Sequence, residues 1–310
     1  MGLWPFPPGG AEVSYRGRFA PTPSGPLHFG SVVAALGSWL DARAHGGEWH
    51  LRIDDLDPPR VVQGARTSII ATLERLGLVW DGPIGVQSGR SDAYEEAMEH
   101  LARRGHLYRC ACSRREIAAA GLPGIEGPRY PGTCRNRTDV PATAAAWRID
   151  VRGVTIAFDD LLQGPVSQDL DAAIGDFVLR RGDAVHSYHL ACVVDDATGG
   201  YTHVVRGADL LDSTPRQIFL QRLLTLPTPA YLHLPVAVDA RGAKLSKQTL
   251  AAPVDADRPS KTLIRALTFL GHGPPPDLAL ALPSTLLDWA VRHWDRALLP
   301  RTRTAPLPGR

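Results

Sequence analysis

Lysine and cysteine are scarce in this chain of 310 residues, and its charges are nearly balanced. The chain has 34 Lys and Arg against 32 Asp and Glu. This balance excludes a strongly basic protein that coats nucleic acid and a protein dominated by an acidic tail. No run of about 18 apolar residues occurs, and the opening MGLWPFPPGG lacks the features of a signal peptide. We therefore expect neither secretion nor a membrane span, and a polyanionic partner must bind a locally basic surface.

The four cysteines are too few for a disulfide scaffold, so we expect a reducing cytoplasm. Three of them, Cys110, Cys112 and Cys134, lie in one segment, which favours a metal site because thiolates suit zinc. A closed zinc site needs four ligands, and spacing alone leaves His106, Tyr130 and Cys192 as candidates for the fourth. A redox cluster or a plain structural cluster is the alternative. Cys192 itself lies in the apolar run LACVV, which favours a packed thiol.

Common nucleotide-binding and hydrolytic fingerprints are also missing. The sequence contains no GxGxxG, GxxxxGK[ST], GxSxG or HExxH. Dehydrogenase, P-loop NTPase, α/β-hydrolase and zincin functions all lose support.

The first eighty residues alternate between strand and helix patterns. YRGRF predicts a strand, a Pro/Ser/Gly turn follows, residues 29–45 show helical periodicity, EWHLRID predicts a second strand and VVQGARTSIIATLERLGL a second helix. This order is typical of a parallel βαβ unit, so the fold class is α/β with a doubly wound parallel sheet.

Residues 98–138 interrupt that rhythm. Between 99 and 137 there are eight Arg, three Glu and no Asp, which makes this the basic patch of the chain. Strand patterns return with AWRIDV, VTIAFDDLL and SYHLACVVDD, the last predicted as a buried strand, so the sheet is expected to resume after an insertion. The end, RTRTAPLPGR, is predicted to be unstructured.

Two segments favour phosphate chemistry. At the first strand-to-helix turn, His28 and Gly30 stand where a helix N-terminus offers unpaired N–H groups to phosphate, although His28 could simply cap the helix. Two of only three lysines lie in KLSKQ, residues 244–248, as a mobile cationic clamp for a triphosphate. A solvated turn is the alternative for KLSKQ.

Together RFAPTPSG, HFGS, RIDDLDPPR, VRGADLL and KLSKQ resemble a class I aminoacyl-tRNA synthetase of the glutamyl type, over residues 15–250. The resemblance implies a Rossmann-like catalytic domain with an inserted zinc-binding lobe and a short helical C-terminal region. The implied division is a loose extension 1–14, catalytic halves 15–97 and 166–250, an RNA-facing lobe 98–165, a helical region 251–300 and a disordered tail 301–310.

The resemblance extends to truncated members of the family, which attach glutamate to queuosine in the anticodon of tRNA(Asp). Only 62 residues, 249–310, follow Gln248, too few for the anticodon-binding region of a full-length glutamyl-tRNA synthetase. The implied partners are ATP with Mg²⁺, L-glutamate and this tRNA, and we expect a monomer. The alternatives are a synthetase that charges a tRNA 3′ end and a non-catalytic RNA-binding module.

A glutamate pocket must hold two carboxylates and one ammonium, which calls for cationic or hydroxyl donors and one acid. The residues predicted to bind glutamate are Arg18, Phe19, Ala20, Pro21, Thr22, Asp54, Tyr188 and Arg206. The residues implied at ATP are Pro21, His28, Gly30, Ser31, Lys244, Ser246 and Lys247, with His28 and Lys247 as the catalytic pair. As alternatives, Arg18 and Arg206 could bridge strands and Tyr188 could belong to the core.

Two further expectations come from the resemblance. It selects Tyr130 as the fourth ligand of a structural zinc beside Cys110, Cys112 and Cys134. It also exposes a departure, because Asp54 stands where the family usually has a Glu that is longer by one methylene. A bridging water, a small backbone shift or the adjacent Asp55 could restore the ammonium contact.

Overall fold

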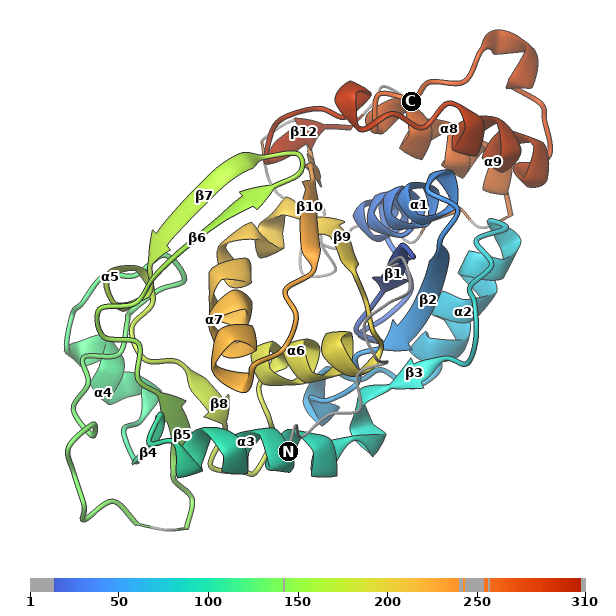
Figure 1. Ribbon diagram of the computed structural model, residues 1–310. Helices are drawn as coiled ribbons and strands as arrows, with labels where there is room; N and C mark the ends of the chain where they lie inside the picture. The colour runs from blue at the N-terminus through green and yellow to red at the C-terminus, as the bar shows by residue number, and fades with distance from the viewer. Residues whose placement is uncertain (1–13, 142, 240–241, 243–253, 256, 308–310) are drawn as a thin grey trace.

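The fold begins with a parallel βαβ unit, as predicted. The computed structural model describes residues 14–141, 143–239, 242, 254–255 and 257–307. Strand β1 (Arg16–Phe19), helix α1 (Phe29–Ala44), strand β2 (Glu48–Ile53), helix α2 (Ala65–Arg75) and strand β3 (Gly85–Val86) follow in order, and the strands pair in parallel as β1-β2-β3. Figure 1 shows α1 and α2 beside these strands.

A second parallel pair continues this layer. Strands β9 (His203–Gly207) and β10 (Ala230–Leu234) pair in parallel, and the Thr202 N–H donates to the Arg16 carbonyl at 2.9 Å, which places β9 beside β1. Helix α7 (Thr214–Leu224) makes the crossover between β9 and β10 (Figure 1). The parallel strands thus come from two segments of the chain, and their carboxyl ends meet at one edge.

The intervening segment is built from antiparallel strands. Strands β4 (Leu107–Cys110), β5 (Ala146–Ile149) and β8 (Val178–Arg180) form one sheet, and β6 (Thr155–Asp160) with β7 (Gly164–Asp169) forms a hairpin. Helices α3 (Ser91–Arg103), α4 (Arg114–Ala119) and α5 (Leu170–Ala173) accompany them.

The expected return to the parallel sheet at AWRIDV and VTIAFDDLL is therefore wrong. The predicted boundary at residue 165 also divides the β6–β7 hairpin. Alternation of apolar residues identifies a strand but not its partner. Three residues, 161–163, join β6 to β7, and so short a connection permits only antiparallel pairing.

The segment SYHLACVVDD is a helix, which corrects the predicted strand. Helix α6 spans Tyr188–Thr198, and the Ser187 hydroxyl caps it by accepting a hydrogen bond from the Leu190 N–H. Residues 190–196 are all buried, so the apolar run carries no clear period. A short buried run does not distinguish helix from strand, and the Ser at the cap position was the local signal for a helix.

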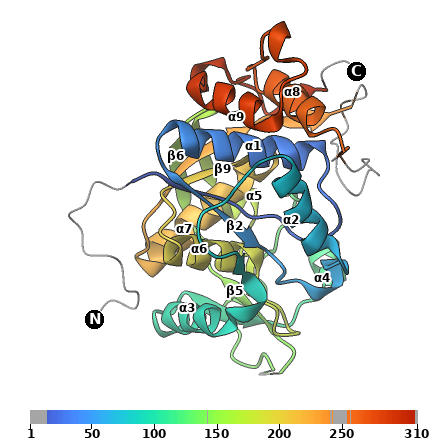
Figure 2. The same ribbon diagram turned by 90° about the vertical axis from the view of Figure 1, so that its right-hand side faces the viewer.

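The C-terminal region is predominantly helical, as expected, but it also contains a strand near its end. Helices α8 (Pro259–Phe269) and α9 (Pro283–Arg292) pack on α1, at the opposite end of the molecule from α3 (Figure 2). Strand β12 (Thr304–Pro306) pairs in parallel with β11 (Val236–Val238), so the prediction of an unstructured tail is wrong for these residues. Backbone hydrogen bonds from a distant strand supply an order that the composition of the tail does not indicate.

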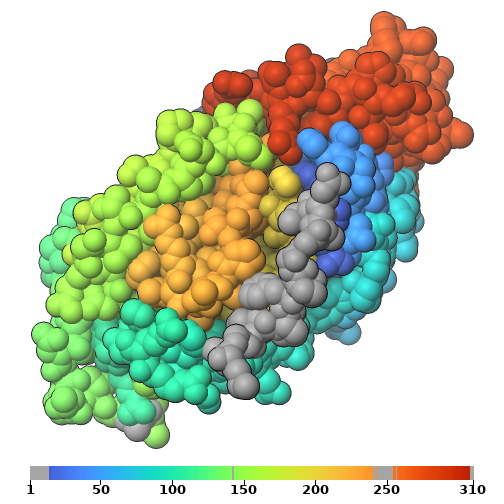
Figure 3. Space-filling view, in the orientation of Figure 1, coloured from blue at the N-terminus to red at the C-terminus, as the bar shows by residue number. Residues whose placement is uncertain are grey.

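Two buried cores hold the layers together. One lies between the parallel strands, α1, α2 and the C-terminal helices, and the other between α3, α6, α7 and the antiparallel strands. Figure 3 shows the C-terminal region (red) bordering both the first helical region (blue) and the β6–β7 hairpin (yellow-green).

Short 3₁₀ turns complete the fold, at Pro58–Arg60, Gln87–Gly89, Ala208–Ser213, Pro276–Leu278 and Arg296–Leu298. Among the described residues, no helix is long and apolar enough to cross a membrane.

Candidate active site and metal cluster

A cavity of about 630 Å³ opens at the carboxyl ends of β1, β9 and β10 and at the start of α1. Ligands of open parallel sheets bind at this edge. The predicted residues that line it are Arg18, Phe19, Ala20, Pro21, Thr22, His28, Gly30, Ser31, Tyr188 and Arg206. Predicted residues up to 188 positions apart in the sequence, Arg18 and Arg206, therefore line one cavity.

Arg18 lines the cavity and is held by an acid that is not among the described lining residues. Its Nε and Nη2 donate to the two carboxylate oxygens of Asp196 on α6, at 3.2 and 3.0 Å. Both side chains are buried, at 4% and 5% exposure. Arg18 thus bridges β1 and α6 and also lines the cavity, so its predicted bridging and binding roles are compatible.

Arg206 is fixed by a chain of polar groups. Its Nε donates to His233 Nε2 at 3.0 Å, and its Nη2 donates to Thr214 Oγ1 at 2.7 Å. His233 Nδ1 in turn lies 2.6 Å from Asp160 Oδ2, which assigns the proton to Nδ1 and leaves Nε2 as the acceptor. Burial lowers the pKa of His233 to about 4, and this keeps the ring neutral.

Tyr188 begins α6 and borders the cavity. It is 37% exposed, so the alternative of a core position does not hold. The Arg206 Nη1 donates to its hydroxyl at 3.5 Å, and the loss of water around this partly enclosed phenol raises its pKa. Two guanidinium groups and one phenol therefore converge on the same space.

His28 caps helix α1. Its Nδ1 accepts from the Ser31 N–H at 3.3 Å, and its Nε2 lies 3.1 Å from the Ser31 hydroxyl. The side chain also lines the cavity beside Gly30. The capping role and a position at the helix N-terminus, where anions bind, are both realised.

Asp54 is not among the described residues that line the cavity. Arg52 holds its carboxylate through Nε at 2.7 Å and Nη2 at 3.3 Å, and burial raises the pKa of the carboxyl. Asp55 points elsewhere as well, because it accepts hydrogen bonds from Ser88 N–H and Oγ at 2.8 and 2.9 Å. Neither acid is among the described residues that line the cavity, although Asp54 lies close enough to Arg18 for that charge to oppose the rise in its pKa.

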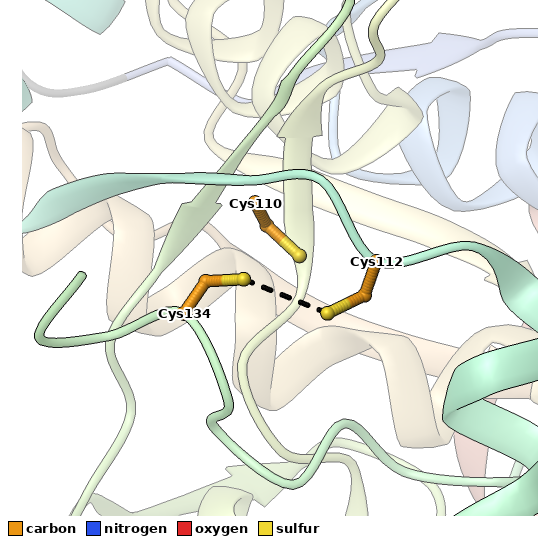
Figure 4. A group of neighbouring side chains, drawn as sticks. All are labelled: Cys110, Cys112 and Cys134. Atoms are coloured by element: carbon orange, nitrogen blue, oxygen red, sulfur yellow. Dashed lines mark hydrogen bonds between the residues drawn. The ribbon is translucent and has the colours of Figure 1, made fainter. Parts of the chain in front are cut away.

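Three cysteines form a compact cluster next to the antiparallel strands β4, β5 and β8, which we call the antiparallel lobe together with the β6–β7 hairpin. The Sγ atoms of Cys110, Cys112 and Cys134 lie within 4.8 Å of one another and converge on one point (Figure 4). Tyr130 Oη lies 3.8 Å from Cys112 Sγ and accepts from the Cys134 N–H at 2.8 Å. All four predicted zinc ligands are thus neighbours.

The donor set of this cluster fits zinc. Burial opposes ionisation of Cys134, but hydrogen bonds, that from Tyr130 foremost, outweigh it and lower the pKa of the thiol to about 7. Burial raises the pKa of Cys112 to about 11. Cys192, the other candidate ligand, is buried on α6, with its Sγ 3.4 Å from Asp196 Oδ2.

Comparison with known proteins decides the family. The family model described as the catalytic domain of class I tRNA synthetases (E and Q) matches residues 14–279. The chain belongs to this family. A glutamyl-Q tRNA(Asp) synthetase from Aromatoleum aromaticum is 56% identical over 96% of this chain and 95% of the relative, and one from Dechloromonas aromatica is 53% identical over 95% and 98%.

Solved synthetase structures agree with the fold. The glutamate tRNA ligase of Elizabethkingia meningosepticum, crystallised with its amino acid, aligns with a TM-score of 0.78 at 26% identity, over 95% of this chain and 67% of that chain. The glutamate-tRNA synthetase of Elizabethkingia anophelis aligns with a TM-score of 0.79 at 25% identity, over 95% of this chain and 68% of that chain. The predicted class I synthetase fold and the enzyme class, a ligase, are confirmed.

Part of the predicted synthetase site lies outside the described residues. Lys244, Ser246 and Lys247 of KLSKQ fall in the range 243–253. Two acids that the sequence did not single out take part instead. Asp209 of VRGADLL lines the cavity, and Asp196 holds Arg18. The signal for Asp196 was the acidic pair at the end of SYHLACVVDD, which becomes informative once that segment is a helix.

The structure also divides the basic patch of this synthetase into two groups. Arg129 and Arg135 pair with Asp171, Arg135 also with Asp176, and Arg137 with Asp139. The other five form no ion pair with any described residue and are exposed, namely Arg103, Arg104, Arg109, Arg114 and Arg115. Within the basic patch, the second group therefore keeps positive charge that is available to a polyanion.

Proposed function

We propose that this synthetase activates L-glutamate with ATP and Mg²⁺ and transfers the glutamyl group to queuosine in the anticodon of tRNA(Asp). The single observation that carries the glutamate part is the convergence of Arg18, Arg206 and Tyr188 on one cavity. The relatives that bear the name glutamyl-Q tRNA(Asp) synthetase support the tRNA part. Buried cations discriminate against glutamine, since an uncharged amide leaves one of them unpaired.

The proposed division of labour follows from the cavity walls. The two arginines hold the carboxylates of glutamate, and the N-terminus of α1 receives the phosphates of ATP at His28, Gly30 and Ser31. The α-carboxylate oxygen attacks the α-phosphorus in line, which forms the glutamyl-adenylate and releases pyrophosphate. Lys247 is proposed to follow the negative charge that moves onto the pyrophosphate. Positioning and charge stabilisation supply most of the acceleration.

The substrate ammonium makes the most demanding contact of this proposal. We propose Asp54 as the acceptor for this ammonium. The contact requires that one Asp54 carboxylate oxygen exchange its hydrogen bond with Arg52 for one with the substrate. Phe19, Ala20, Pro21 and Thr22 complete the wall on that side.

We propose that the cysteine cluster with Tyr130 holds one structural zinc. Zinc would cross-link β4 to the loop at Cys134 and thereby fix the Arg-rich surface toward the RNA. Metal binding requires reduced thiols, which is why we keep the cytoplasm as the proposed location. The oligomeric state we propose is a monomer.

The decisive experiment separates activation from transfer. Glutamate-dependent exchange of pyrophosphate into ATP is expected without tRNA. Charging is expected with tRNA from queuosine-proficient cells, even after periodate oxidation of the 3′ end, and not with tRNA from queuosine-deficient cells. Charging that periodate abolishes would show a synthetase for the tRNA 3′ end, and absence of exchange would show a non-catalytic RNA-binding protein.

A further inference from the structure

We propose that Asp196 is a positioning residue for glutamate binding, which fixes the Arg18 guanidinium so that its Nη1 is left for a carboxylate of the substrate. Asp196 lies behind the cavity and is not among the described residues that line it. The inference rests on the proposed function, because it requires glutamate to enter the cavity.

The contacts define the orientation of Arg18. Asp196 accepts from Nε and Nη2, which are two adjacent donors of one planar group. Nη1 donates to none of the described residues, whereas the side chain lines the cavity. Because a guanidinium is rigid and planar, fixing one edge fixes the direction of the remaining donors. A carboxylate in the cavity therefore meets a donor whose position is already set.

Asp196 is itself immobilised. Its Oδ1 accepts from Arg52 Nη1 at 2.6 Å, and Arg52 is held in turn by Asp54. Burial opposes ionisation of Asp196, but the charges of Arg18 and Arg52 outweigh it and keep the pKa of the carboxyl well below its usual range. The side chains of Arg18, Arg52, Asp54 and Asp196 are all 5% exposed or less. Water therefore cannot replace the hydrogen bonds that a displaced Asp196 would lose. The Asp54–Arg52 pair thereby gains a function that does not require Asp54 to reach the cavity.

The chain offers a matched control on the same helix. Asp195 and Asp196 are both 4% exposed and both ion-paired. Asp195, however, accepts from Arg90, Gln87 and Tyr94, none of which is among the described residues that line the cavity. Asp195 also lies 3.9 Å from Arg52 Nε, but Arg18 donates to Asp196 and not to Asp195. A purely structural role predicts the same consequence for both acids.

The test compares Asp196→Asn with Asp195→Asn in pyrophosphate exchange, with glutamate and ATP varied separately. Asp196→Asn is expected to raise KM for glutamate on the order of 100-fold, as displaced positioning groups do. Its KM for ATP should stay within about twofold, and Asp195→Asn should leave both KM values within about twofold. An equal rise in both variants, or no rise in Asp196→Asn, would overturn the proposal.

A second variant covers a failure of Asp196→Asn to fold, monitored by circular dichroism. Asp196→Glu keeps the charge between the two arginines but displaces the carboxylate by one methylene, so KM for glutamate should rise while KM for ATP does not. If KM for glutamate is unchanged in Asp196→Glu, the inference about Asp196 is wrong, whereas the proposed function is unaffected. If the unaltered chain shows no glutamate-dependent exchange, the proposed function fails and this inference fails with it.

Discussion

At the scale of single residues, the cavity is shaped by partners that hold its functional side chains. Arg206 is a clear case, because the groups that fix it, Thr214 and His233, lie on two different elements. Only its Nη1, 3.5 Å from the Tyr188 hydroxyl, faces another predicted binding residue. The side chains that we propose to bind substrate are thus prearranged by others that do not line the cavity.

Replacing Tyr188 by Phe tests the phenol at the cavity. The ring keeps its packing, but the hydroxyl can no longer donate to a substrate carboxylate, a hydrogen bond worth about 1.5–3 kcal/mol when one partner is charged. We expect KM for glutamate to rise about 10- to 100-fold, with KM for ATP unchanged, in pyrophosphate exchange. The buried Tyr231, whose hydroxyl accepts from Gln221 at 2.9 Å, supplies the control Tyr231→Phe. Equal effects of both variants would contradict a contact with substrate.

His233 gives stability a defined pH dependence. Its pKa falls from 6.5 in the unfolded chain to about 4 in the folded chain, so the unfolded state binds the proton more readily between these values. Stability from this group is full above pH 6.5 and is lost as pH falls toward 4, by up to about 3 kcal/mol. Urea unfolding of the unaltered chain and of His233→Gln at pH 7 and pH 4.5 measures the difference. If His233→Gln loses as much stability between pH 7 and pH 4.5 as the unaltered chain does, groups other than His233 cause the loss.

At the scale of elements, the predictions that succeeded depend on local signals. The helix 29–44 and the strands at 16–19 and 48–53 carry their own periodicity and turns, and these were predicted. Helix α6 was not, because its whole sequence from 190 to 196 is buried. Strand β12 owes its order to β11, about seventy residues earlier, and no local pattern encodes that pairing.

One buried acid adds a polar contact between α1 and the C-terminal region. Asp41 on α1 is fully buried and accepts from Tyr15, Trp294 and both Nε and Nη2 of Arg296. Replacing Asp41 by Asn leaves the guanidinium uncompensated, and such losses cost about 3–5 kcal/mol. We expect a destabilisation of about 3 kcal/mol in urea unfolding, somewhat reduced because Arg296 is partly exposed.

The control for Asp41 uses an exposed ion pair between α2 and the segment that precedes α8. Arg75 on α2 and Asp257 form an ion pair at 3.3 Å, with 59% and 89% exposure. Asp257→Asn should change stability by less than about 0.5 kcal/mol, because exposed pairs contribute little. A comparable loss in both variants would mean that the number of charges, and not burial, controls the attachment.

The cysteine cluster makes a prediction for the antiparallel lobe. We expect about one zinc per chain by elemental analysis, and little after Cys134→Ser, because a thiolate ligand is removed from a closed four-ligand site. Cys192→Ser serves as the control, since this thiol lies on α6 outside the cluster, and it should retain the metal. Full zinc content in Cys134→Ser would contradict the site.

At the scale of the whole molecule, the site combines segments whose contacts the sequence does not specify. The cavity residues Arg18, Tyr188 and Arg206 were predicted from the charges of glutamate and from the resemblance, and two of them, Arg18 and Arg206, lie in distinctive motifs. The acid that holds Arg18 was not, since it is 178 residues away and its role depends on the helix that presents it. Likewise, the count of eight arginines did not reveal that three of them pair with the acids Asp139, Asp171 and Asp176.

That division predicts which arginines hold the tRNA. Arg114 and Arg115 begin α4, which packs beside β4 through Ile117 and Tyr108, and they form no ion pair with any part of the chain that the structure describes. Their double replacement by Ala should weaken tRNA binding and lower the slope of log K against log salt by about 0.7–0.9 for each phosphate that the protein no longer neutralises. Glutamate-dependent exchange should persist, because α4 is not part of the cavity wall.

The matched control removes two arginines that already have acidic partners. Arg137 pairs with Asp139 at 2.7 Å and Arg152 with Asp150 at 2.6 Å, and both arginines are about half exposed, at 47% and 54%. Their double replacement by Ala changes the net charge by the same amount as the Arg114 and Arg115 pair. If only net charge matters, the two double variants will lower affinity and salt slope equally. If local contact matters, as the structure implies, the slope of the control will stay close to that of the unaltered chain.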